Sequence, residues 1–478
     1  MFTTAELFGK FHSPKKSLRH TLDRVGKAPP SELEQLFKDC LPAGLLSQAD
    51  SGLNSRERVY SVRVTFWSFM WQALNHAPCR SAVRKVMAWF SLHGLPAVKE
   101  DTSPYCKGRG RLDRDTLKQG LEGSARAADQ RAPLKWRFHD REVLVADGTT
   151  SAAPDTRKNQ RAFPQSALQK PGCGFPMVRW VGLFSLATGA LVDVAIGNKH
   201  KAELTLLRRI WDRLKKGMIF LADRGFCDYV TLAGLFLRGV DSVLRLNGSR
   251  DYDFRKGKRL GAGDRLVVWQ KPSRRTRTAT KKLWRRLPDQ ITLRLICWPV
   301  TIPGFRTRKV VLVTTLLDPV AYPAAELAGL YLRRWRVELF LRDIKTTLGI
   351  DTLTCKTPKM LYRELMMHLI AYNMIRCLMV EAASISGVNL EKISFKGAVD
   401  TLHHFSLALA IARSHKQRIE LVVEMLRAMA QDRLPTRPNR IEPRCCKRRR
   451  KAYPVMVKPR SELKAKILLG KKRKSKGA

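Results

Sequence analysis

Two short apolar runs that each end in an aspartate constrain the fold of this chain more than any other feature. They are EVLVADGTT, from Glu142 to Thr150, and MIFLADRGF, from Met218 to Phe226. Apolar runs of this length are typical of strands buried in a sheet. Between them lie a hairpin pattern at 175–197, with its turn at Thr188–Gly189, and a polar helix at 201–216. This succession predicts an α/β domain whose mixed sheet is covered by helices on both faces.

The rest of the chain divides by pattern and composition. At about 150 residues per domain, 478 residues suggest roughly three units. We predict a helical DNA-binding domain at 1–111, the α/β domain at 140–382 with a β-rich insertion at 247–317, a helical region at 383–443 and a basic tail at 444–478. The stretch EDTSPYCKGRGR at 100–111 is rich in Gly, Pro and charge and is predicted to be a loop. The tail holds 15 Lys or Arg against one acid, which is typical of a disordered, solvated arm that contacts nucleic acid.

The excess of basic residues indicates the class of partner. Lys and Arg number 90 against 41 Asp and Glu, which gives a net charge of +49. Such an excess repels itself unless a polyanion neutralises it, and nucleic acid is the natural one. The basic residues are spread along the whole chain rather than gathered on one amphipathic segment, which disfavours a membrane surface as the partner.

Targeting and redox features predict a cytoplasmic, nucleoid-associated protein without a membrane partner. The first residues lack the apolar run of a signal peptide. The most apolar window, beginning at Met366, is interrupted by His368, Asn373 and Arg376, so we expect a core-facing helix there. The ten cysteines form no CxxC pair, which disfavours a zinc site or a disulfide framework and fits a reducing compartment.

A third acid, Glu338, stands in the basic stretch YLRRWRVELFLRDIKTTLG, from Tyr331 to Gly349. The pattern predicts one continuous helix from Ala324 to Leu348. At about 100° per residue, four polar side chains fall within a stripe about 60° wide beside the buried face: Tyr331, Arg334, Glu338 and Lys345. An ordinary ion pair between residues four apart explains the charges. It does not explain an acid held among basic and aromatic side chains.

Asp147, Asp223 and Glu338 are together the candidate metal ligands. The two aspartates end buried strands, where active sites form in α/β sheets, although a single aspartate there often only caps a turn. Three carboxylates supply the oxygen ligands that hard cations require. Two Mg²⁺ ions can activate a water or a 3′-hydroxyl and stabilise the leaving oxygen at a phosphodiester. Neighbouring Arg and Lys side chains would restore the affinity for phosphate.

One spacing resembles the YREK signature of the IS-four-type DDE transposases of bacterial insertion sequences: Tyr331, Arg334, Glu338 and Lys345, separated by two, three and six residues. Asp147 in ADGTT and Asp223 in LADRGF resemble the two catalytic aspartates of that family. The stretch TSPYCKGRGRL resembles the segment before its catalytic domain, and the strands between Asp223 and Glu338 are similar to its β-strand insertion. The resemblance covers about residues 55–380.

The resemblance implies an RNase H-like catalytic domain, two divalent metal ions (Mg²⁺, with Mn²⁺ as a substitute) and cut-and-paste transposition by DNA cleavage and strand transfer. Asp147, Asp223 and Glu338 would be the catalytic metal ligands. Five residues would contact DNA: Tyr331, Arg334, Arg342, Lys345 and Trp298. Some members stack a flipped base on a tryptophan of the insertion, for which Trp269, Trp284 and Trp298 are candidates. The expected partners are double-stranded DNA, as the terminal inverted repeats of the element and as target, and a second subunit, because transposition joins two ends.

Three other functions remain open from the residues. An RNase H-like nuclease would cut DNA without joining it. A domesticated sequence-specific DNA-binding protein would keep the fold with an inactive site, which the intact acids and spacing disfavour. A basic chromosome-packing protein would account for the charge of +49 but not for the placement of three acids.

Overall fold

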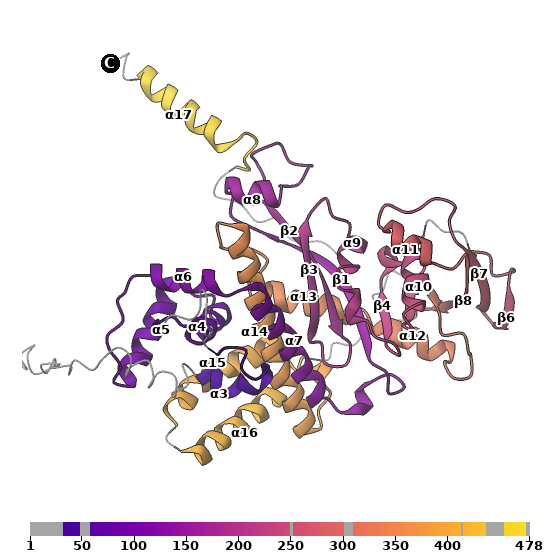
Figure 1. Cartoon of the computed structure of the whole chain (residues 1–478), viewed down its shortest axis with the longest axis horizontal. Helices are drawn as coiled ribbons and strands as arrows, with labels where there is room; N and C mark the ends of the chain where they lie inside the picture. Colours follow the sequence, from indigo (N-terminus) through magenta and orange to yellow (C-terminus); the bar gives the residue numbers. More distant parts are fainter. Residues whose placement is uncertain are drawn as a thin grey trace, which may run out of the picture.

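One mixed sheet of nine strands runs through the molecule (Figure 1). The computed structural model describes residues 32–47, 58–248, 252–300, 309–412, 414–435 and 454–474. Parts of the predicted N-terminal domain, at 1–31, and of the predicted tail, at 444–453, lie outside the described residues.

The strand order places the two aspartate-bearing strands side by side at the centre. The order across the sheet is β3-β2-β1-β4-β5-β9-β8-β7-β6. The strands are β1 (Val143–Ala152), β2 (Met177–Ser185), β3 (Leu191–Asn198), β4 (Ile219–Ala222), β5 (Asp241–Arg245), β6 (Lys258–Gly261), β7 (Asp264–Gln270), β8 (Gln290–Pro299) and β9 (Lys309–Thr314). β4 is parallel to β1 and to β5, and the other neighbours are antiparallel. The predicted β-rich insertion therefore extends the same sheet through β9.

Helices cover both faces of the sheet, as the apolar runs predict. Along β1, Val143 and Val145 belong to one core and Leu144 and Ala146 to the other, because side chains alternate along a strand. The first core is the larger and includes side chains from α4 (Val62–Leu74), α7 (Arg114–Arg131), α12 (Ala324–Arg333), α14 (Pro358–Ser386), α15 (Phe395–Ile411) and α16 (His415–Gln431). The second lies under α9 (Glu203–Leu207) and α10 (Tyr229–Phe236), with the short α11 (Lys281–Arg286) at its margin. The polar helix predicted at 201–216 is reduced to α9 and the turn η4 (Trp211–Arg213).

The central helix α14 anchors the sheet to the helical layer (Figure 1). Its length and composition would suit a membrane span, but 78% of its most apolar window is buried in the protein, as the prediction of a core-facing helix requires. Its polar side chains hold the β2–β3 turn. Asn373 accepts a hydrogen bond from the Leu191 N–H at 2.8 Å and donates to the Leu191 carbonyl at 2.9 Å. Arg376 Nε donates to the Thr188 carbonyl at 2.8 Å.

The prediction of a loop at 100–111 was wrong. Residues Ser103–Arg111 form helix α6, next to α4 and α5 (Cys79–Leu92). Tyr105 and Arg109 are buried, and the Arg109 guanidinium lies 4.1 Å from the Phe69 ring centroid while donating to Cys79 Sγ at 3.0 Å. These contacts stabilise a helix that its two glycines disfavour. The described start of the N-terminal region is helical as predicted, with α3 at Glu32–Phe37.

The prediction of one continuous helix at 324–348 was also wrong. The chain turns at Arg334–Trp335 between α12 and α13 (Arg336–Arg342), and then widens into a π-helical turn, η6 (Asp343–Thr347). A uniform 100° per residue therefore does not describe the segment. Tyr331 and Arg334 are buried, whereas Glu338 and Arg342 are exposed.

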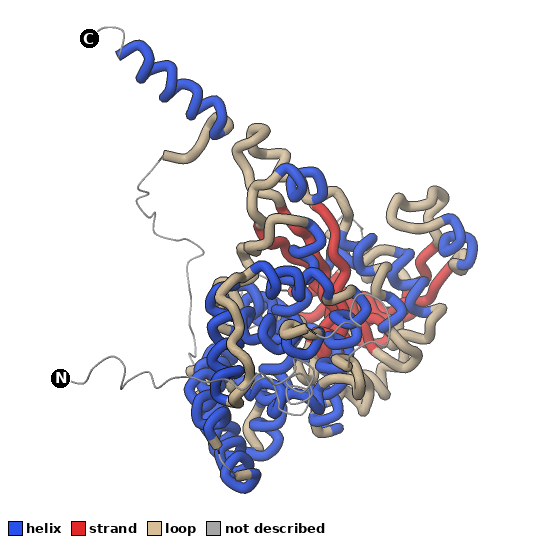
Figure 2. Tube along the Cα trace, turned by 60° about the vertical axis from the view of Figure 1, so that its left-hand side comes forward, coloured by secondary structure: helices blue, strands red, loops and turns tan. Residues whose placement is uncertain are grey.

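The prediction of a wholly disordered tail fails at its end. Residues Arg460–Lys474 form helix α17, which stands away from the body of the molecule in both views (Figures 1 and 2). Its side chains are mostly exposed, so it is a basic helix rather than part of the core.

Candidate active site

Asp147 lies on β1, and Asp223 directly follows the neighbouring parallel strand β4. Val145 of β1 pairs with Leu221 of β4, the last pair of that ladder. Each aspartate is two residues past that pair, and the Asp223 charge is near enough to act on the Asp147 carboxyl. Val145 and Leu221 both face the first core, so the two aspartates project from the same face of the sheet. Asp223 also caps the short turn η5 (Arg224–Phe226), where Oδ1 accepts a hydrogen bond from the Gly225 N–H at 2.9 Å.

The Asp147 carboxyl is held in surroundings that favour its protonated form. Burial is the main cause that raises its pKa to about 6, and the nearby carboxylates of Asp223 and Glu203 act in the same direction. The Gly148 N–H, which donates to Oδ1 at 2.8 Å, and the Arg334 guanidinium oppose them. Negative charge is therefore concentrated at this edge of the sheet, where a cation would offset it.

Glu338 reaches the same region from α13, which packs against β1. Its side chain is 59% exposed, and Oε1 accepts a hydrogen bond from Arg334 Nη2 at 3.3 Å. Arg334 is only 6% exposed and also lies near enough to Asp147 to lower its pKa. Arg334 thus interacts with both carboxylates, and its Nε has no hydrogen-bond partner within the described residues.

Tyr331 lies inside the protein beside the acids. It is 1% exposed, and burial raises the pKa of its phenol. The charges of Arg334, Arg245 and Asp223 all act on it. The Arg334 guanidinium is 5.8 Å from the Tyr331 ring centroid and 5.7 Å from that of Trp335. In this structure Tyr331 supports the site from behind rather than presenting a surface.

Lys345 and Arg342 share an open groove with Glu338. The groove has a volume of about 660 Å³ and follows α13, η6 and the loop as far as Thr352. Lys345 Nζ pairs with Asp351 at 2.9 Å, and Arg342 pairs with Asp343 at 3.5 Å. Ala152, at the end of β1, forms a bridge with Thr352, so the groove begins where β1 ends.

The candidate tryptophans of the insertion are covered to different degrees. Trp269 is buried in the second core, and Trp284 is half-buried with Lys271 Nζ 5.3 Å from its ring centroid. Trp298 lies near the end of β8 opposite Val310, half-buried against the first core. Stacking of a base on Trp298 stays a prediction.

Two charged neighbours of the site were missed by sequence reasoning. Glu203, at the start of α9, lies so close to Gly148 that a β-carbon there would be 2.6 Å from its carboxyl carbon. Arg245, at the end of β5, is near enough to act on Tyr331. A signal for Glu203 existed, because a glycine inside a strand often marks the close approach of another group.

Two of three comparisons with known proteins bear on this arrangement. Residues 138–374 match the family described as Transposase DDE domain. The chain is 26% identical over 450 residues to the Transposase InsG for insertion sequence element IS4 of Escherichia coli (strain K12), covering 92% of this chain and 96% of that protein. Among solved structures, a piggyBac transposase synaptic complex with hairpin DNA is similar with a TM-score of 0.40 and 9% identity, covering 89% of this chain and 88% of the other.

The family match spans the strands and helices that carry Asp147, Asp223 and Glu338, and the chain is a DDE transposase. It is an enzyme that cleaves and transfers DNA strands with divalent metal ions. Within that class it is a transposase of the IS4 type.

Proposed function

We propose that this transposase excises and inserts its own element by a cut-and-paste route, at an RNase H-like site formed by Asp147, Asp223 and Glu338. The observation that supports the proposal is the parallel pairing of Val145 with Leu221, two residues before each aspartate, together with the packing of α13, which carries Glu338, against β1.

The sheet supports the RNase H-like assignment. In β3-β2-β1-β4-β5, a three-stranded antiparallel meander is followed by two strands parallel to β1. Helices cover both faces. In such a fold the acids belong near the carboxyl ends of the central parallel strands. Asp223 directly follows β4, and Asp147 lies beside it.

The donor set fits a hard divalent cation, for which we propose Mg²⁺, with Mn²⁺ able to replace it. Asp147 is a partly buried carboxyl whose pKa is raised to about 6 by burial, with two further acids close by. Across the described part of the chain, no three acidic, Cys or His side chains are gathered tightly enough to hold a metal ion. Glu338, now paired with Arg334, is the exposed member that would complete the ligand set. Bound there, the cations would activate the attacking hydroxyl and stabilise the leaving oxygen.

The basic residues around the acids divide into two groups in this proposal. Arg342 and Lys345 lie in the open groove beside Glu338 and would contact the DNA backbone. Arg334, whose buried Nε has no partner among the described residues, would donate to the phosphate between the acids, with Tyr331 packed behind it. Trp298 would act from the insertion.

The proposed partners follow from the reaction. The DNA is the terminal inverted repeats of the element together with target DNA. Two ends are joined in one reaction, so we propose that two subunits assemble on DNA through the helical region at 383–443. Such a protein would act at the nucleoid in the bacterial cytoplasm.

The proposal is tested with purified protein, Mg²⁺ and DNA carrying the element ends. Asp147→Asn, Asp223→Asn and Glu338→Gln should each lower cleavage by at least about 10³-fold, the order expected when a reaction loses a metal ligand worth several kcal/mol. DNA binding in a chelator should stay within a few-fold of the parent. Asp253→Asn, which removes an acid of the insertion paired with Arg255, is the matched control and should cleave normally. Full cleavage by any of the three site variants would refute the site.

The same assay separates transposition from simple cutting. With target DNA present, a transposase yields joined product, whereas a nuclease yields only cut ends. Cleavage without any joined product would refute the strand-transfer part of the proposal and leave the metal site standing.

A further inference from the structure

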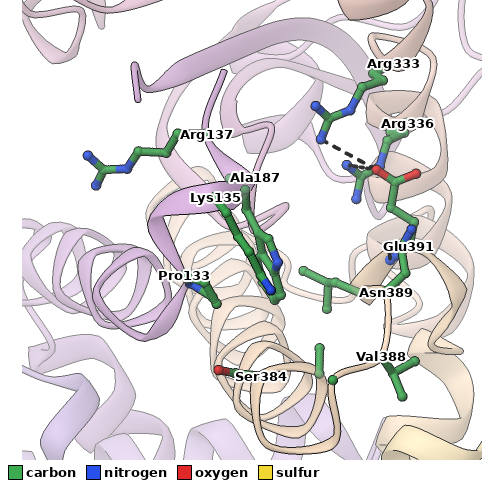
Figure 3. A pocket seen from close by; sticks show the side chains of 14 residues that line it. Pro133, Lys135, Arg137, Ala187, Arg333, Arg336, Ser384, Val388, Asn389 and Glu391 are labelled. Carbon is green, nitrogen blue, oxygen red and sulfur yellow. Dashed lines mark hydrogen bonds and ion pairs between the residues drawn. The ribbon is translucent and has the colours of Figure 1, made fainter. Parts of the chain in front are cut away.

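A basic pocket lies beside the start of α13 (Figure 3). It has a volume of about 390 Å³ and is formed where the segment before β1, the β2–β3 turn, the α12–α13 junction and the end of α14 meet. Its lining includes Lys135, Trp136, Arg137, Arg333, Arg336 and Glu391. We call this site the Arg336 pocket.

The Arg336 side chain is held in place by burial and by hydrogen bonds. Its side chain is 12% exposed, and Nη1 donates to the Leu186 carbonyl at 3.1 Å. Glu391 bridges two guanidinium groups, with its Oε1 2.7 Å from Arg336 Nη1 and 3.5 Å from Arg333 Nη2 (Figure 3). A single carboxylate oxygen therefore receives two arginines, in the way that phosphate oxygens do.

Positive charge in the Arg336 pocket exceeds what Glu391 can neutralise. The lining holds four basic residues and one acid. Arg137 points away from the pocket in Figure 3 and pairs with Glu142 at 3.0 Å, which leaves Lys135, Arg333 and Arg336 around Glu391. Burial is the main cause that lowers the pKa of Arg336 to about 10; Arg376 and Arg333 act in the same direction, and Glu391 opposes them. A further anion whose oxygens contact both guanidinium groups would reduce this repulsion.

The position of the pocket relates it to the proposed site. Arg336 and Glu338 are two residues apart, on opposite sides of α13. Ala187 of the lining follows Leu186, whose N–H donates to the Val143 carbonyl at 2.9 Å, so the pocket lies at the start of β1. Asp147 is four residues further along that strand, on the order of 13 Å away. That length corresponds to about four base pairs at about 3.4 Å each, so a duplex that continues along the protein surface from the acids can present another phosphate to the pocket.

We infer that the Arg336 pocket binds a backbone phosphate of the DNA on which this transposase acts, and that Glu391 holds that place in the DNA-free protein. The inference rests on the proposed function for the location of the DNA. Trp136, beside the basic side chains, provides a ring on which a sugar or base next to that phosphate can lie. Binding exchanges the Glu391 contacts for contacts to DNA, so Glu391 competes with the substrate.

The experiment measures binding of a labelled duplex carrying an element end, in a chelator, from about 50 to 300 mM salt. Glu391→Gln should bind several-fold more tightly at every salt concentration, because the competing charge is gone. Arg333→Gln should bind more weakly, with a salt slope shallower by about 0.9 because one phosphate is no longer neutralised. Arg336→Gln should act in the same direction, and Arg333, whose side chain is 37% exposed, keeps the test valid if that variant does not fold.

Glu424→Gln is the matched control, since it removes the same charge from an exposed pair with Arg427 on α16. Equal gains for Glu391→Gln and Glu424→Gln would overturn the inference, because the effect would then be net charge alone. Calorimetry with inorganic phosphate separates a free-phosphate site from a DNA contact. Saturable phosphate binding with an unchanged DNA slope in Arg333→Gln would also overturn it. Because binding is read without cleavage, loss of the pocket and loss of the catalytic proposal are distinguishable.

Discussion

At the scale of single residues, the site combines groups that oppose each other. Burial and the neighbouring acids disfavour the ionised form of Asp147. The nearly buried Arg334 guanidinium acts in the opposite direction on Asp147 and also pairs with Glu338. Gly148 leaves the space in which Glu203 comes close. Such a site lowers the free energy of unfolding of the metal-free protein, and a bound divalent cation would raise it again.

The stability cost of Asp147 should depend on pH in a defined direction. Its pKa is about 6 in the folded chain against an ordinary value of 3.8, so the folded state binds the proton more tightly than the unfolded state. The cost is then absent below about pH 4, grows between about pH 4 and 6, and is complete above about pH 6, where it amounts to at most about 3 kcal/mol. Asp147→Asn should raise Tm at about pH 7.5 in a chelator and leave it nearly unchanged near pH 4.

Thermal melts with and without Mg²⁺ check this expectation and the cation fit together. Mg²⁺ should raise the Tm of the parent at about pH 7.5 but not that of Asp147→Asn, whose amide is a poorer ligand. Asp212→Asn removes a largely exposed aspartate that pairs with Arg238 and serves as the control. A variant at position 147 that is less stable than the parent above about pH 6 would contradict the assignment of burial as the cause.

At the scale of elements, strands were more predictable than helices. The runs at 142–150 and 218–226 predicted β1 and β4 because an apolar run ending in an acid has few alternatives in a covered sheet. The acids share a face through a register set by pairing across the sheet, which no local pattern contains. The break between α12 and α13 falls at Arg334–Trp335, beside the buried side chains of Tyr331 and Arg334, and a count along one ideal helix could not show it. Helix α6 was missed because tertiary contacts outweigh the low helix propensity of its glycines.

Helix α6 offers a matched pair of glycines for testing that explanation. A β-carbon at Gly108 would lie 2.8 Å from Thr65 Oγ1 and 3.2 Å from Tyr60 Cβ, whereas Gly110 has nothing within 4 Å. Gly108→Ala should therefore destabilise the protein by about 1–3 kcal/mol through overpacking. Gly110→Ala should be neutral or stabilise it by up to about 1 kcal/mol, because alanine favours the helix. Urea unfolding of the two variants measures the difference. Equal effects would show that packing against α4 does not hold α6 in place.

At the scale of the whole molecule, the charge of +49 is distributed between a folded body and a projecting helix. The folded body carries the three candidate acids, the groove with Arg342 and Lys345, and the Arg336 pocket. Helix α17 lies apart from them, and its described side chains are mostly exposed rather than packed against the body. We therefore expect its charge to attract DNA at long range rather than to serve the fold or the chemistry.

Removal of residues 460–478 should separate these roles. The segment holds eight Lys or Arg and one Glu, and its helix stands away from the body, so the truncated protein should keep its Tm. Non-specific binding to duplex DNA should weaken, with a salt slope reduced by about 0.9 for each phosphate that the segment no longer neutralises. Cleavage at low salt should persist, because the acids and the groove are untouched. Anisotropy titrations from about 50 to 300 mM salt, beside thermal melts, measure both quantities. A lower Tm would place α17 in the folded core, and an unchanged salt slope would show that its basic residues do not contact DNA.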